Sequence, residues 1–281
     1  MNAQIKIPKE QALKNLRTEI AAGRPIIAAG AGVGLIGRIV DRAGIDLVVV
    51  YNSGYYRMNG YSSILGNLPV GDANQIVVEL GEKSILNAVH RAPVVAGIYG
   101  IDPTRDMEKL LARLAEIGYS GVINYPTVGK IGGTMRQELE SVGLGLAREI
   151  ETMKLASRMG FLTMAYVFNP EEAALFAKAG LDILVAHVGL TQGGDVGAAT
   201  KIGLSEAIRN SNLILKAGLK ARRNVIPLCH GGSISTPEDA QKALAETVAV
   251  GFVGASSIER LPVEQAVSRV VEDFKKIPIP A

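Results

Sequence analysis

The sequence has very little cysteine, no tryptophan and almost no net charge. Of its 281 residues only Cys229 is a cysteine, so no disulfide forms within the chain, and we expect a reducing, cytoplasmic location. Lysine and arginine number 30 against 27 acidic residues, and no basic cluster interleaves with aromatics, so we expect no nucleic acid partner. No apolar run approaches the roughly 20 residues that span a bilayer, and residues 1–22 are amphipathic without a signal-peptide core. We therefore expect no membrane partner.

Apolar residues make up 48% of the chain and gather in eight short runs. Between consecutive runs lies at least one stretch with apolar residues at helical spacing, which predicts a strand and helix repeated eight times. We expect a single domain over residues 1–281, an α/β (β/α)8 TIM barrel with its chemistry at the carboxyl ends of the strands. The predicted strands are 26–29, 47–50, 94–98, 121–123, 162–165, 183–186, 225–228 and 251–254.

Two connections are too long for a minimal barrel. Residues 51–81 follow the second strand and residues 124–133 follow the fourth, whereas such loops usually hold 2 to 6 residues. Both insertions emerge at the catalytic face, so they are interpreted as lids or as subunit contacts of a homo-oligomer. Ser53 and Arg57 in the first insertion are candidate contacts for an anionic substrate.

The glycines after the first strand match a G-x-G-x-x-G string. The acidic residue that a dinucleotide fold requires at the end of its second strand is missing, because Asp46 begins that strand. We therefore interpret Gly30 and Gly32 as a tight turn that brings backbone close to a small anion.

A second anion site is predicted after strands seven and eight. In many TIM barrels these two loops bind phosphate through backbone N–H groups and hydroxyls. Pro262 suits the first turn of the final helix, which leaves residues 256–260 for a short extra turn. Ordinary glycine turns are the alternative. The candidate residues are His230, Gly231, Gly232, Ser233, Ala255, Ser256 and Ser257.

Titratable residues at the strand ends are few. His187 ends strand six and is the candidate general acid or base, while His230 is expected to contact the anion. Asp102, after strand three, is a candidate base and a candidate Mg²⁺ ligand. A structural hydrogen bond for either histidine, or an Asp-Pro turn for Asp102, is the alternative.

Five strings resemble a known family. They are GVINYPTVG at 121–129, AYVF at 165–168, LVAHVGLT at 184–191, HGG at 230–232 and GASSIERLPVE at 254–264. They resemble the TIM-barrel phosphoenolpyruvate-hydrolase-like family, which also looks like the C-terminal half of a plant tobamovirus-resistance protein. The likeness runs from about residue 23 to 271.

The resemblance implies a barrel of the phosphoenolpyruvate mutase and isocitrate lyase type, acting on 2-oxo acids and their enols with Mg²⁺. It adds Tyr166 as a catalytic candidate and Asn124 as a ligand candidate. The lyase string KKCGH and an Asp-x-Asp pair are absent from the sequence.

Together these patterns favour an enzyme acting on a small anionic metabolite. We expect a hydrolase or lyase that cleaves a bond in phosphoenolpyruvate, phosphonopyruvate or a related 2-oxo acid through an enolate-type intermediate. The alternative is a barrel without catalysis that senses a ligand or binds a protein, because a fold alone does not fix a function.

Overall fold

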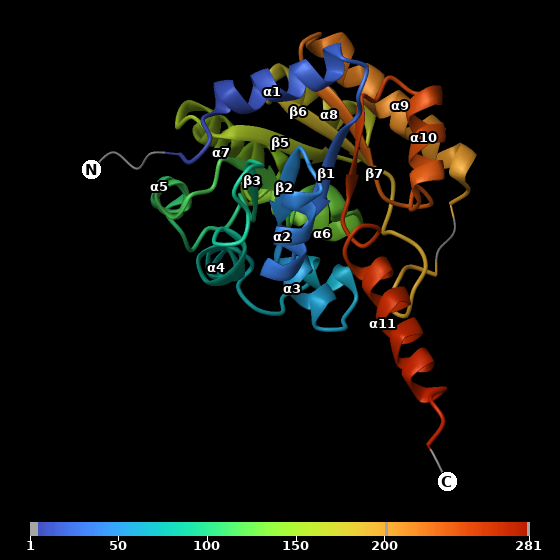
Figure 1. The fold of residues 1–281 in the computed structure, drawn as a ribbon. Coiled ribbons are helices and arrows are strands. Elements are labelled where there is room, and N and C mark those ends of the chain that lie inside the picture. The colour runs from blue at the N-terminus through green and yellow to red at the C-terminus, as the bar shows by residue number, and fades with distance from the viewer. Residues whose placement is uncertain (1–4, 200–201, 280–281) are drawn as a thin grey trace.

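Eight parallel strands close into a barrel in the computed structural model, which describes residues 5–199 and 202–279 (Figure 1). Each strand pairs with its neighbours in chain order, and β1 pairs with β8, with Ala28 opposite Val253. The predicted TIM barrel is therefore confirmed. The strands are β1 (Ile26–Gly30), β2 (Leu47–Val50), β3 (Val94–Ile98), β4 (Gly121–Asn124), β5 (Leu162–Val167), β6 (Ile183–His187), β7 (Ile226–His230) and β8 (Gly251–Gly254).

Alternate residues of each strand point into the barrel. On β5, Leu162, Met164 and Tyr166 belong to the interior cluster, while Ala165 and Val167 pack outward against helices. This alternation follows from the pleat of a strand, whose successive side chains face opposite sides. Because the interior is filled in this way, the last inward residue of each strand faces the mouth.

Helices surround the barrel and close one end of it. α1 (Lys9–Ala21) places Ala12 and Leu16 against the interior cluster, so it closes the end where the strands begin. The helices that return the chain along the outside are α2 (Gly34–Arg42), α4 (Ala73–Leu80), α5 (Met107–Ile117), α7 (Leu146–Arg158), α8 (Pro170–Lys178), α9 (Leu204–Ala221) and α10 (Pro237–Glu246).

Both predicted insertions are present as separate elements. After β2 the chain forms α3 (Asn52–Met58) and the short helix η1 (Ser63–Asn67), and a π-helical segment η2 (Gly81–Ile85) follows α4. After β4 it forms η3 (Val128–Lys130) and α6 (Gly133–Ser141) before α7. None of the helices in the described ranges is long and apolar enough to cross a membrane.

The last helix leaves the barrel. α11 (Arg260–Lys275) projects away from the other helices in Figure 1, and Arg260 is its one residue classed as buried. The helix begins at Arg260, so the prediction that Pro262 opens it is wrong by two residues. Hydrogen bonds from the N–H of Ile258 and Glu259 to the carbonyl of Ala255 form the preceding turn and bring Arg260 into helical geometry.

The interior packing predicts that two leucine-to-alanine substitutions differ strongly in their effect on the free energy of unfolding. Leu228 on β7 is fully buried in the barrel, whereas Leu213 on α9 is 62% exposed. We expect Leu228→Ala to lower the free energy of unfolding by about 2–5 kcal/mol, and Leu213→Ala to change it by less than about 0.5 kcal/mol. Urea unfolding followed by circular dichroism measures both, and equal losses would contradict the packing described.

Candidate functional site

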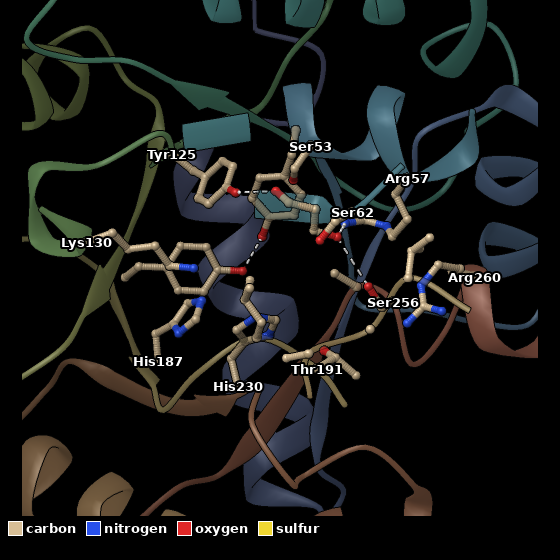
Figure 2. Close-up of a pocket in the computed structure, with 18 residues that line it drawn as sticks. Ser53, Arg57, Ser62, Tyr125, Lys130, His187, Thr191, His230, Ser256 and Arg260 are labelled. Carbon is tan, nitrogen blue, oxygen red and sulfur yellow. Dashed lines mark hydrogen bonds between the residues drawn. The ribbon is translucent and has the colours of Figure 1, made fainter. Parts of the chain in front are cut away.

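A narrow cavity lies at the mouth of the barrel, where the strands end (Figure 2). The cavity has a volume of about 40 Å³, and a single water molecule needs about 10–15 Å³. The space therefore suits a ligand of a few heavy atoms. The lining residues are Tyr51, Ser53, Arg57, Ser62, Ser63, Tyr125, Lys130, Tyr166, His187, Leu190, Thr191, Val196, Gly197, Ala198, His230, Ala255, Ser256 and Arg260.

Three tyrosines form the floor of this cavity. Tyr51, Tyr125 and Tyr166 continue the inward-facing sets of β2, β4 and β5. The hydroxyl oxygens of Tyr51 and Tyr166 lie 2.6 Å apart, and the ring of Tyr125 meets that of Tyr51 edge-on at 5.2 Å. Burial raises the pKa of Tyr51 and Tyr166, so both phenols remain protonated hydrogen-bond donors near neutral pH.

Two histidines lie beside the tyrosines, and their hydrogen bonds assign opposite tautomers. Their ring centroids are 4.7 Å apart. Nδ1 of His187 accepts a hydrogen bond from the N–H of Gly189 at 3.2 Å, which leaves the proton on Nε2. Nδ1 of His230 donates to the carbonyl of Val253 at 2.6 Å, so its Nε2 carries the lone pair. His187 thus presents a hydrogen-bond donor to the cavity and His230 an acceptor.

Both imidazoles are uncharged near neutral pH. Burial lowers the pKa of His187 well below its usual value, and the charge of Lys130 lowers it further. Burial also lowers the pKa of His230 to about 4, although its hydrogen bond to Val253 opposes the shift. The site therefore offers a neutral donor and a neutral acceptor side by side.

A buried ion pair fixes the first insertion over the mouth. Nε of Arg57 on α3 donates to Oε1 of Glu259 at 2.6 Å, and both side chains are almost fully buried. Oε2 of Glu259 accepts the N–H of Gly32 at 2.8 Å, while Nη1 of Arg57 reaches Ser63 at 3.0 Å. The pair thus joins the ends of β1 and β8 to α3, and Glu259 compensates the charge of Arg57.

The second insertion brings Lys130 to the opposite side of the cavity (Figure 2). The carboxylate of Glu149 accepts hydrogen bonds from the Thr127 hydroxyl at 2.8 Å and the Val128 N–H at 3.0 Å, which fixes the turn before Lys130. Burial raises the pKa of Glu149 to about 7. Within residues 5–199 and 202–279, Nζ of Lys130 makes no ion pair or hydrogen bond. The two other lining cations, Arg57 and Arg260, are paired with Glu259 and Glu264.

The structure brings together about half of the predicted site residues. Those that line the cavity are Ser53, Arg57, Tyr166, His187, His230, Ala255 and Ser256. Those that lie outside its lining are Gly30, Gly32, Asp102, Asn124, Gly231, Gly232, Ser233 and Ser257.

Three of the predicted residues outside the lining have clear structural partners, whereas the buried hydroxyl of Ser233 has no hydrogen-bond partner in the described ranges. The N–H of Gly32 is bound by Glu259, and that of Gly232 donates to the carbonyl of Gly189 at 2.9 Å. The amide of Asn124 joins Glu149 at 2.7 Å to the backbone of Tyr166. These groups therefore hold together the segments next to the cavity and do not line it.

Asp102 lies in an Asp-Pro turn away from the cavity. Its carboxylate accepts the Thr104 N–H at 2.9 Å and faces Nε of Arg105 at 3.0 Å. Burial raises the pKa of Asp102, but the hydrogen bonds from Thr104 and Asn74 and the charge of Arg105 together outweigh it, so the net shift is downward. In the described ranges no group of three His, Cys, Asp or Glu side chains is placed to hold a metal.

Sequence reasoning missed several lining residues. Tyr51 and Tyr125 each stand directly after a strand, and counting every second residue along β2 and β4 would have placed both in the mouth. Lys130 follows β4 by six residues and carries no comparable signal. Ser62 and Thr191 lie in loops, while Ser63 begins η1 and Arg260 begins α11, and the positions of all four depend on tertiary packing.

The fold and the strand-end cavity define a TIM barrel similar to solved enzymes. A phosphoenolpyruvate phosphomutase from Streptomyces platensis matches with a TM-score of 0.62 at 18% identity, covering 94% of this chain and 87% of that one. A phosphonopyruvate hydrolase in complex with oxalate and Mg²⁺ matches with a TM-score of 0.59 at 16% identity, with the same coverage. These likenesses establish the fold.

The chain belongs to the phosphoenolpyruvate hydrolase-like family, whose model matches residues 11–277. It is 46% identical over 266 residues to the tomato (Solanum lycopersicum) ToMV resistance protein Tm-1(GCR237). That alignment covers 94% of this chain and 35% of the tomato protein, so the chain spans about a third of that relative's length. The resemblance inferred from the sequence is confirmed.

The opposite histidine tautomers are directly measurable. We expect long-range proton–nitrogen spectra of ¹⁵N-histidine-labelled protein at pH 6 to show His187 protonated on Nε2 and His230 on Nδ1, because each Nδ1 has a different backbone partner. His187→Gln and His230→Gln assign the signals. A shared tautomer, or an imidazolium signal from either residue at pH 6, would contradict this account.

Proposed function

We propose that this chain is an enzyme that binds a small acid of the pyruvate type and cleaves a bond next to its carbonyl carbon. The observation that carries the proposal is the cavity itself, in which the ammonium group of Lys130, unpaired among the residues that the structure describes, faces neutral phenol, imidazole and hydroxyl donors. Such a site favours one carboxylate or phosphonate group of low total charge. The phosphonopyruvate hydrolase neighbour, named in complex with oxalate, supports an acid of this class.

The chain's own residues supply the polar contacts that such an acid needs. Lys130 is available to bind its carboxylate, and the hydroxyl groups of Ser53 and Ser256 line other parts of the same cavity. Nε2–H of His187 and the hydroxyl of Tyr166 donate toward the oxygen on which enolate charge develops. Nε2 of His230 is the acceptor for a proton from an attacking water or hydroxyl.

The Mg²⁺ that the resemblance implied does not fit the residues at this cavity. Mg²⁺ prefers several oxygen ligands, usually including carboxylates. Glu259 lies beside the cavity but is bound to Arg57 and to the N–H of Gly32, and Asp102 lies elsewhere. The proposal therefore assigns no step to a metal, although a related fold is known with Mg²⁺.

Acid binding at Lys130 is the test of this function. We expect phosphonopyruvate, pyruvate or oxalate at about 100 times its dissociation constant to stabilise the protein by about 2.7 kcal/mol in a thermal-shift assay. Losing the charged contact in Lys130→Met costs about 1.5–3 kcal/mol, or about 10- to 150-fold in affinity. Lys109→Met, at an exposed lysine of α5, is the matched control.

Two results would decide against the proposal. If none of these acids shifts the melting temperature of the native protein, a barrel that senses another ligand or binds a protein becomes the better account. If Lys109→Met weakens binding as much as Lys130→Met, the acids bind outside the cavity.

We also propose that the chain forms a homo-oligomer through α11. The exposed residues Val263, Val267, Val270, Val271 and Phe274 are spaced four, three, one and three apart, so they form one apolar face. The same chain leaves an apolar groove open beside α10, lined by Ile27, Ala240, Leu244, Phe252 and Ile258 among others. Because α11 stands away from the barrel, we infer that its apolar face packs into the groove of a second copy of the chain.

A charged substitution on the apolar face of α11 should dissociate the proposed homo-oligomer. We expect Val267→Glu to shift the protein to monomer in analytical ultracentrifugation, because the new carboxylate would be buried in the groove. Gln265→Glu, on the opposite side of α11, is the control and should leave the assembly unchanged. A native protein that sediments as a monomer would refute the proposed association.

A further inference from the structure

We propose that Lys130 captures the carbonyl carbon of a 2-oxo acid as an imine. This inference rests on the proposed function and narrows it, because it requires a ketone in the substrate and assigns the nucleophile that attacks this ketone to the chain itself. Phosphonopyruvate and oxaloacetate meet the requirement, whereas phosphoenolpyruvate has no ketone.

The first support is the position of Lys130. Its side chain lines the cavity from η3, on the same side as Tyr125 and His187 (Figure 2). In the part of the chain that the structure describes, no carboxylate pairs with its Nζ, although Arg57 and Arg260 at the same cavity are both paired. A lysine that only compensated charge would have an acidic partner, and this one faces the ligand space instead.

The second support is that the backbone around Lys130 is fixed. Glu149 accepts hydrogen bonds from Thr127 and Val128, and Arg136 donates to the carbonyl of Val128 at 2.7 Å. A side chain added at Gly129 would approach Phe168 to 2.4 Å, so the turn packs closely against the end of β5. The amine is thereby held at the mouth by a rigid segment.

Burial gives this amine the reactivity that the step needs. Removal from water lowers the pKa of Lys130 from 10.5 to about 8. At pH 7 about one molecule in ten then carries the free amine, against about one in 3,000 for an ordinary lysine. Desolvated lysines of this kind are the nucleophiles of Schiff-base enzymes.

The step balances without a metal. The lone pair of Nζ attacks C2 of the 2-oxo acid, the carbonyl π pair moves to oxygen, and that oxygen takes protons and leaves as water. The electron pair of the bond broken at C3 then forms the C2–C3 double bond of an enamine, and the positive iminium nitrogen becomes neutral. The phosphoryl group of phosphonopyruvate passes to a water molecule and leaves as phosphate, whereas the carboxylate on C3 of oxaloacetate leaves as CO₂. Protonation at C3 and addition of water return the keto product and the free Lys130 amine. His187, with its proton on Nε2, is the neutral imidazole at this cavity that can donate a proton to the departing oxygen.

Reductive trapping tests this inference. The protein is incubated with pyruvate or phosphonopyruvate and sodium cyanoborohydride, which reduces an iminium to a stable secondary amine. We expect one adduct, mapped by peptide mass spectrometry to Lys130, with a rate of formation that rises with pH through about 8 because the neutral amine attacks. Phosphoenolpyruvate should give none.

Two variants separate the nucleophile from the charge. Lys130→Arg retains a cation and should retain most acid binding in the thermal-shift assay while losing the adduct, and Lys109→Arg should behave as the native protein. If the acids bind but native Lys130 is not labelled, the imine is refuted and the proposed function stands. If the acids neither bind nor label, both are refuted.

Discussion

The alternation of side chains along the eight parallel strands is the constraint on which the site depends. Leu47 and Val49 on β2 and Tyr51 directly after it face the barrel interior. On β6 and β7 the last inward-facing residue is a histidine. Because a closed barrel has an interior that must be filled, these inward positions are fixed in space as firmly as the core. The polar residues at the ends of the strands are consequently held on a rigid frame rather than on loops.

The buried Arg57–Glu259 ion pair determines which charges remain at the mouth of the barrel. A buried ion pair contributes little net stability but makes each partner costly to remove, since the other would be left charged and unpaired. Here the pair joins α3 to the ends of β1 and β8, and the carboxylate of Glu259 neutralises the charge of Arg57. Lys130 is left as the charge that an acid meets, while burial keeps His187 and His230 neutral.

The sequence predicted the fold more completely than the site, for a physical reason. Strands buried on both faces are continuous apolar runs, so all eight strands and both insertions could be located from the sequence. Glycines such as Gly32 and Gly232 were taken as anion ligands, but backbone N–H groups have partners that only tertiary structure reveals. Lys130 was missed because its importance comes from the lack of a paired carboxylate among the described residues, which no local pattern encodes.

The central claim is that a small acid binds at the mouth of the barrel among Lys130, His187 and the tyrosines. A crystal structure with bound oxalate, which does not form an imine, tests it most directly. We predict that a carboxylate oxygen lies within about 3.2 Å of Lys130 Nζ and that oxalate stays between the side chains that line the cavity. Oxalate bound elsewhere, with the cavity holding only water, would contradict the account.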